Sequence, residues 1–244
     1  MPIKTRSKSP RHAAKSRSKS TSTPSKTGER LKEYRRKRDF TKSPEPTGAT
    51  ARSKKKPAKE LFFCVQKHWA SQLHYDFRLE YKGVLLSWAV PKGPSVKPSE
   101  KRLAMRVEDH PFDYGEFEGV IPEGDGAGIV MLWDRGTWEP ESENIDTALS
   151  KGELKFKLNG VKLKGSWVLV RTGKGDERSW LLIKHRDEWS GDVDIATFAP
   201  DSIKSGGDFK AILTQDNPQF WESHRAGGTG EQLKKVITKV MAEE

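Results

Sequence analysis

Cysteine is almost absent from this chain: Cys64 is the only one among 244 residues. A single cysteine excludes an internal disulfide framework and any zinc site built from several thiolates, and it is compatible with a reducing compartment. No apolar run approaches the roughly 18 residues that a transmembrane helix requires. The basic N-terminus is not followed by an apolar segment, so the sequence predicts no secretory signal.

Apolar residues are also scarce. Hydrophobic residues make up 33% of the chain and charged residues 32%, with a mean hydropathy of -0.80, which is too polar for one compact globule of the full length. Acidic residues are scarce in residues 1–60, where 20 Lys and Arg stand against 5 Asp and Glu, a net charge of +15. The remainder has a net charge of -4. A cationic segment on a near-neutral body indicates a polyanionic partner, most often nucleic acid, although a tail that only aids solubility has the same composition.

Changes of composition divide the chain into five expected segments. They are a disordered basic tail (1–27), an N-terminal segment (28–46), a Lys-rich linker (47–59), a folded body (60–200) and a C-terminal extension (201–244) with a helix over 230–242. The tail consists mainly of Ser, Thr, Lys, Arg and Pro and has too few apolar residues to offset its ordering entropy. The N-terminal segment begins with a short charged helix in which Leu31 and Tyr34 share one face.

Short runs of β-branched, aromatic and leucine residues alternate with Gly, Pro and Asp after Glu60. They predict strands at 61–66, 73–80, 83–89, 102–107, 128–133, 153–158, 161–163, 167–171 and 179–184. Asn159–Gly160 predicts a hairpin between two of them. Only 146–151 and 230–242 have helical periodicity in this part of the chain. The fold class is therefore mainly β: a small antiparallel barrel or sandwich with a few short helices.

Three functional side chains alternate along the predicted strand 73–80. Alternation places His74, Asp76 and Arg78 on one face, expected to meet solvent or a cleft, and the apolar residues between them in the core. His68 precedes the strand at a distance that a turn can fold back. Two imidazoles and a carboxylate suit a divalent metal, and the planar arginine suits phosphate. An amphipathic strand with a polar outer face has the same pattern, as do the iron ligands of non-haem oxygenases.

Cations and proton donors follow this strand. A phosphate site needs cations for the phosphoryl oxygens and a donor for the leaving oxygen. Lys92, Arg102, His110 and Tyr114 supply both if the fold brings them together.

Longer strings resemble a known family. Val65–His68, Leu73–Glu80, Ser87–Pro94, Lys101–Ala104 and Val107–Pro111 resemble segments of the 3′-phosphoesterase family, the nuclease and phosphatase module of bacterial ATP-dependent DNA ligase D, which also occurs as a stand-alone protein. The likeness runs from about residue 29 to 190. It implies a small β-barrel with a metal-dependent activity, with Mn²⁺ and other divalent metals as the expected cofactors. Such enzymes remove a 3′-terminal ribonucleoside from DNA and then the remaining 3′-phosphate.

The resemblance also implies roles for single residues. His68, His74 and Asp76 match metal ligands, and Arg78, His110 and Tyr114 match catalytic residues. Lys92, Arg102 and Glu108 match phosphate- or substrate-binding residues. Arg38, Asp39 and Glu45 match catalytic positions in a segment that folds over the site. The sequence departs from the family at Cys64, where an aliphatic residue is usual, and at Asp125, where an aromatic residue is usual.

The expected partners follow from this resemblance. They are DNA 3′ ends and, because no ligase lysine motif or polymerase domain is present, a separate ligase, polymerase or end-binding protein of non-homologous end joining. The expected location is the cytoplasm, at the nucleoid, with no membrane partner. A non-catalytic DNA-end-binding repair factor is the alternative, and the intact ligand set argues against it. The neighbouring cations Arg78, Lys92 and Arg102 disfavour an oxygenase.

Overall fold

The computed structural model describes residues 26–37, 61–122, 126–173, 176–215 and 230–242. Its strands are β1 (Leu61–Trp69), β2 (Leu73–Tyr81), β3 (Val84–Val90), β4 (Lys101–Pro111), β5 (Gly119–Ile121), β6 (Gly128–Pro140), β7 (Glu153–Gly160), β8 (Lys164–Arg171) and β9 (Ser179–Lys184). Its helices are α1 (Lys26–Arg30), α2 (Lys32–Arg36), η1 (a 3₁₀ helix, Phe112–Glu116), α3 (Ile145–Lys151), α4 (Ile195–Phe198), α5 (Phe209–Leu213) and α6 (Gly230–Ala242). No helix among the described residues is long and apolar enough to cross a membrane.

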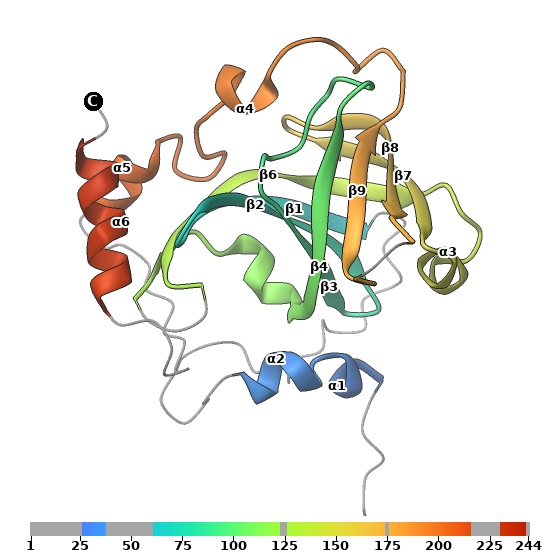
Figure 1. The fold of residues 1–244 in the computed structure, drawn as a ribbon, viewed down its shortest axis with the longest axis horizontal. Coiled ribbons are helices and arrows are strands. Elements are labelled where there is room, and N and C mark those ends of the chain that lie inside the picture. The colour runs from blue at the N-terminus through green and yellow to red at the C-terminus, as the bar shows by residue number, and fades with distance from the viewer. Residues whose placement is uncertain (1–25, 38–60, 123–125, 174–175, 216–229, 243–244) are drawn as a thin grey trace, which may run out of the picture.

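Eight antiparallel strands close into a barrel (Figure 1). Their order is β1-β2-β3-β4-β9-β8-β7-β6, and β6 pairs again with β1. The long strand β6 closes the barrel, because one of its edges pairs with β1 from Ile129 to Trp138. Its other edge pairs with the short strand β5 near its start and with β7 near its end. The structure confirms the predicted class, a mainly β fold built as a small antiparallel barrel with a few short helices.

Apolar side chains at alternate strand positions fill the barrel. β7 shows the pattern most clearly, with every second residue buried. The largest side chains of this core are the fully buried Trp88, Trp133, Trp138 and Trp167. Each buried aromatic removes about 150–250 Å² from water, so these side chains dominate the energetics of the core. The outer faces of β1 to β3 carry polar side chains beside a second, smaller apolar cluster that includes Leu85 and Tyr114 and against which Phe62 packs.

One predicted strand is wrong. Residues 161–163 form the turn of the β7–β8 hairpin, in which the Gly160 amide donates to the Leu163 carbonyl at 2.9 Å. The hairpin predicted at Asn159–Gly160 exists, but both residues belong to β7. Gly160 is required by packing, because a Cβ atom there would lie 2.6 Å from Phe63 Cζ.

The predicted N-terminal helix is two short helices, α1 and α2, that meet at Leu31. Leu31 and Tyr34 are both buried against the barrel. The expected tail over 1–27 is described only from residue 26. Arg38, Asp39 and Glu45 also lie outside the described residues, so their expected roles stay predictions.

Residues after β9 wrap back over the barrel. The Ala199 carbonyl accepts hydrogen bonds from Trp133 Nε1 and Lys162 Nζ, and the Ile203 amide donates to the Leu132 carbonyl. Helix α4 belongs to the segment that follows β9, and the C-terminal extension (201–244) carries α5 and α6. Figure 1 shows α5 and α6 beside the ends of β1 and β2. The extension therefore packs against the strands that bear the predicted metal ligands.

Candidate active site

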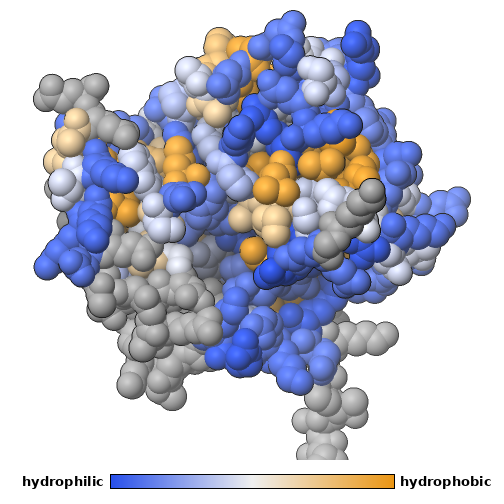
Figure 2. Space-filling model, in the orientation of Figure 1, coloured by the Kyte–Doolittle hydropathy of each residue, from blue (hydrophilic) through white to orange (hydrophobic). Residues whose placement is uncertain are grey.

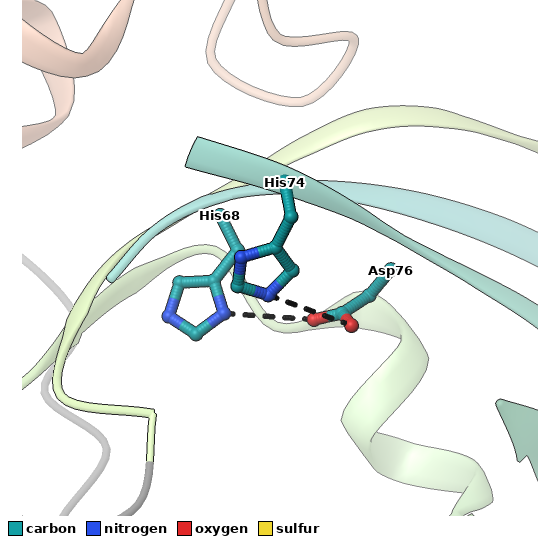
Figure 3. Close-up of side chains that lie close together, drawn as sticks. All are labelled: His68, His74 and Asp76. Carbon is teal, nitrogen blue, oxygen red and sulfur yellow. Dashed lines mark ion pairs between the residues drawn. The ribbon is translucent and has the colours of Figure 1, made fainter. Parts of the chain in front are cut away.

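His68, His74 and Asp76 form one cluster on the outer face of the β1–β2 hairpin (Figure 3). The hairpin register places His68 opposite His74, and alternation puts Asp76 on the same face. The Nδ1 atom of His68 lies 3.6 Å from Asp76 Oδ2, and the Nε2 atom of His74 lies 3.8 Å from Asp76 Oδ1. The three ligand atoms all lie within 4.8 Å of one another.

Backbone carbonyls orient both imidazoles. His68 Nε2 lies 2.8 Å from the Gly126 carbonyl oxygen, and His74 Nδ1 lies 3.0 Å from the Gln72 carbonyl oxygen. Because a carbonyl only accepts, these nitrogens carry the protons. The other nitrogen of each ring therefore presents its lone pair toward Asp76, which is the arrangement that metal-binding histidines require.

The charges of the cluster suit a cation. Burial opposes ionisation of Asp76, but the Arg78 guanidinium holds the pKa of this carboxyl well below its usual range. Burial lowers the pKa of His74, and the charge of Arg78 adds to this shift, although Asp76 opposes it. At neutral pH the cluster thus offers a carboxylate and a neutral imidazole at His74, and these donors fit a divalent transition metal.

Arg78 is buried beside the cluster, with 2% of its surface exposed. Its guanidinium donates to Gln66 Oε1 at 2.8 Å, to Ser87 Oγ at 2.8 Å and to Asp76 Oδ2 at 3.1 Å. This face was expected to meet solvent or a cleft, and the burial of Arg78 excludes open solvent at this residue. The segment after β4 covers the arginine, and the Tyr114 ring centroid lies 4.9 Å from its Cζ atom.

Gln66 and Ser87 are the functional residues that sequence reasoning missed. Both are fully buried, and Gln66 Nε2 also donates to the carbonyls of Tyr114 and Phe117 at 3.0 and 2.8 Å. One amide thus joins the covering segment to the guanidinium of Arg78. Ser87 had a signal, since it is the one polar residue of the apolar strand β3, whereas Gln66 lies next to Lys67 and His68 and does not stand out in β1.

A β-bulge brings His110 to the same face. Leu85 pairs with His110 but Ser87 pairs with Val107, so β4 has one extra residue between these pairs. His110 Nδ1 lies 2.9 Å from the Glu108 carbonyl oxygen and 3.3 Å from Ser87 Oγ. Its ring centroid is 5.0 Å from that of Tyr114 and 5.6 Å from that of Tyr34 in α2. The structure therefore brings His110 and Tyr114 together with Arg78.

Lys92, Arg102 and Glu108 are not joined to the cluster. Among the residues that the structure describes, no hydrogen bond or ion pair connects any of them to His68, His74 or Asp76. Arg102 pairs with Leu182 of β9 and so shares the face of the barrel core, and its guanidinium forms an ion pair with Glu100 at 2.5 Å. Lys92 and Arg102 line a separate cavity of about 450 Å³. Glu108 Oε2 instead accepts from Lys37 Nζ at 3.0 Å.

Comparison with known proteins gives a consistent result. The family described as DNA Ligase D 3′-phosphoesterase domain matches residues 66–171. The multifunctional non-homologous end joining protein LigD of Pseudomonas aeruginosa is 50% identical over an alignment of 184 positions, and the match covers 72% of this chain and 21% of that protein. The LigD protein of Mycobacterium tuberculosis is 44% identical over 161 residues, and the match covers 66% of this chain and 20% of that protein. The LigD protein of Mycolicibacterium smegmatis is 40% identical over 166 residues, and the match covers 66% of this chain and 21% of that protein.

This chain thus spans about a fifth of the length of these relatives. The matched segment contains the ligand cluster, Arg78, His110 and Tyr114. Through residues 66–171 the chain belongs to the DNA ligase D 3′-phosphoesterase domain family.

Proposed function

We propose that this protein is a divalent-metal-dependent phosphoesterase that processes the 3′ ends of DNA. It acts as a 3′-ribonucleoside phosphodiesterase and a 3′-phosphomonoesterase with Mn²⁺ as cofactor, and it prepares 3′-OH ends for ligation in non-homologous end joining. The observation that carries the proposal is the oriented cluster of His68, His74 and Asp76 directly beside the buried Arg78. A bound divalent ion supplies polarisation of a phosphate oxygen or activation of water.

Arg78 binds and neutralises the phosphoryl group. An arginine has five N–H donors, and three of them are used by Gln66, Ser87 and Asp76. Within the part of the chain that the structure describes, two donors thus remain for phosphate oxygens. The three side-chain contacts hold the guanidinium in one orientation, so its charge is in place before the reaction begins.

His110 handles a proton at its Nε2 atom. The Glu108 carbonyl fixes the proton on Nδ1, which leaves Nε2 as the nitrogen that exchanges a proton with substrate. The His110 ring contacts the rings of both Tyr114 and Tyr34, and these two contacts restrict its rotation. Substrate contact through His110 is thereby directed to the same face as Arg78.

The test uses a labelled primer–template that ends in one ribonucleotide or in a 3′-phosphate. With Mn²⁺ the protein is expected to shorten the first substrate and dephosphorylate the second, and EDTA is expected to abolish both reactions. His74→Ala and Asp76→Asn are expected to lose both. His185→Ala is the matched control, because His185 lies beyond β9 and contacts Ser166 instead. Full activity in EDTA would contradict the proposal.

A second readout does not depend on turnover. A ligand that binds only the folded state stabilises it by about 2.7 kcal/mol at a hundred times its Kd. Mn²⁺ is therefore expected to raise the Tm of the unsubstituted protein and of His185→Ala but not that of Asp76→Asn. DNA binding without hydrolysis and without a Tm shift would favour the non-catalytic end-binding factor.

A further inference from the structure

A cavity of about 280 Å³ lies on the face of the β1–β2 hairpin opposite the metal ligands. Trp69 follows His68, and Leu73 precedes His74, so alternation directs Trp69 and Leu73 away from the cluster. Figure 3 shows the ligand side chains on one side of the two strands. The second wall comes from the C-terminal extension, beyond residues 66–171. The cavity is lined by Lys67, Trp69, Leu73, Met131, Pro200, Asp208, Phe209, Lys210 and Val240.

The cavity combines aromatic and apolar walls with cations. The rings of Trp69 and Phe209 meet edge to face with centroids 5.6 Å apart, so Phe209 supports the larger ring. Lys67 Nζ lies 5.3 Å from the Phe209 ring centroid, and Lys210 is exposed on α5. Figure 2 shows apolar surface between α6 and the barrel. The one carboxylate in the lining, Asp208, is already engaged, since it accepts from the Ala211 amide at 2.8 Å.

We propose that this cavity binds an unpaired nucleobase of the DNA strand whose 3′-terminal phosphate lies at the metal site. The inference rests on the proposed function and extends it to the bases next to the reacting phosphate. The Trp69 ring supplies a stacking surface that accepts any base. Lys67 and Lys210 then stand where they meet the phosphates on either side of that base.

The distance between the two sites fits a short piece of one strand. Only residues 70–72 separate β1 from β2, so the hairpin ends two to three residues beyond His68 and His74. At about 3.3 Å per residue this is roughly 7–10 Å. A stacked strand advances about 3.4 Å per nucleotide, so two or three nucleotides reach the hairpin end, where the Trp69–Leu73 pair lines the cavity.

The charge of the surroundings selects nucleic acid as the occupant. Helix α6 exposes Lys234, Lys235 and Lys239 beside α5, and Lys210 continues this set toward the cavity. An apolar floor with lysines around it matches a base flanked by phosphates. The strand that leaves the cavity thus has further cations along its path, and each phosphate contact adds to the salt dependence of binding.

Binding of labelled single-stranded DNA to the full chain in EDTA tests the proposal. One oligonucleotide is intact, and three others have an abasic site at the first, second or third nucleotide from the 3′ end. We expect one of the three abasic positions to weaken binding by roughly tenfold, the loss of one stacked base. Trp69→Ala is expected to weaken binding of the intact strand to the same extent and to cause no further loss on that abasic strand.

Matched variants separate the cavity from general effects. Trp189→Ala removes a tryptophan that is 48% exposed and lies outside the cavity lining, and Lys151→Glu reverses a charge on α3, on the far side of the barrel in Figure 1. Both are expected to bind intact DNA almost as the unsubstituted protein does, whereas Lys210→Glu is expected to bind several-fold more weakly. Lys210 is exposed, so this variant does not depend on repacking the cavity.

Two results would overturn the proposal. One is an equal loss at all three abasic positions, and the other is a Trp69→Ala loss that is the same for intact and abasic strands. Hydrolysis of a 3′-phosphate with Mn²⁺ is measured separately on the unsubstituted protein. Failure of that reaction rejects the proposed function, while the base-position measurement alone decides whether the cavity holds a base.

Discussion

Gln66→Leu tests whether one buried amide holds the site together. The substitution keeps a similar volume but removes the hydrogen bonds that Gln66 makes with Arg78 Nε and with the carbonyls of Tyr114 and Phe117. The Tyr114 carbonyl still accepts from the Phe117 amide at 3.1 Å. A hydrogen bond to a charged group contributes about 1.5–3 kcal/mol, and each of the other two about 1 kcal/mol. After allowing for the added apolar contacts of leucine, we expect the free energy of unfolding to fall by about 3 kcal/mol.

Urea unfolding followed by tryptophan fluorescence measures this loss. With a slope of about 1–3 kcal/mol per molar urea, the midpoint is expected to fall by roughly 1–3 M at an unchanged slope. Gln72→Leu is the control, because Gln72 is an exposed residue of the same hairpin that holds His74 through its backbone carbonyl. Its stability is expected to change by less than about 0.5 kcal/mol. If the two variants unfold at the same urea concentration, the reasoning about Gln66 is wrong.

Three further predictions concern two buried titratable groups and one closely packed glycine. Burial raises the pKa of the Cys64 thiol to about 12, so a thiol reagent is expected to modify no cysteine in the folded protein and one after denaturation; rapid modification of the native state would refute this. Burial also raises the pKa of the Asp134 carboxyl to about 6, against hydrogen bonds from three backbone amides. The folded state therefore keeps a proton on Asp134 that the unfolded chain releases near pH 4. Asp134 thus contributes about 3 kcal/mol to the free energy of unfolding, and this contribution is present below pH 4 and is lost as the pH rises through 6. Between pH 4 and 6 the free energy of unfolding is expected to fall less for Asp134→Asn than for the unsubstituted protein. If the free energies of both proteins change in parallel with pH, the effect is excluded. Gly128→Ala is expected to lower the Tm by several degrees, because the added Cβ atom would lie 2.1 Å from the Trp69 carbonyl oxygen. Gly191→Ala is the control, because a Cβ atom there meets open space, and its Tm is expected to stay nearly unchanged. Equal Tm values for the two variants would refute this argument.

The barrel was predictable because alternation of apolar residues is a local signal. The missed strand β5 has three residues, too few for any periodicity. The error at 161–163 has a different cause. Leu163 is fully buried although it belongs to a turn, and it gives the segment the composition of a strand. Elements that are defined by long-range packing, such as α4 and α5, leave no comparable pattern in the sequence.

The cluster of His68, His74 and Asp76 was predictable for the same reason, since His74 and Asp76 alternate along β2 and His68 lies opposite His74 in the hairpin. Their orientation was not, because the carbonyls of Gln72 and Gly126 belong to the backbone and have no residue signature.

The sequence also could not predict on which face of β4 each side chain lies. Regular alternation would place Arg102 and His110 on one face of this strand. The bulge reverses that relation, so His110 faces the cluster while Arg102 shares the face of the core.

The closure of the barrel has a consequence for the order of folding. The three ligand side chains come from one hairpin, a contact of short range that forms early in synthesis or refolding. The Gly126 carbonyl that orients His68 reaches its place only when β6 pairs with β1, where Ile129 joins Trp69. Contacts of such sequence separation form late, because their loop entropy must first be overcome. The nascent hairpin therefore holds the ligands before it can align them, and metal affinity is expected to appear only with the final closure of the sheet.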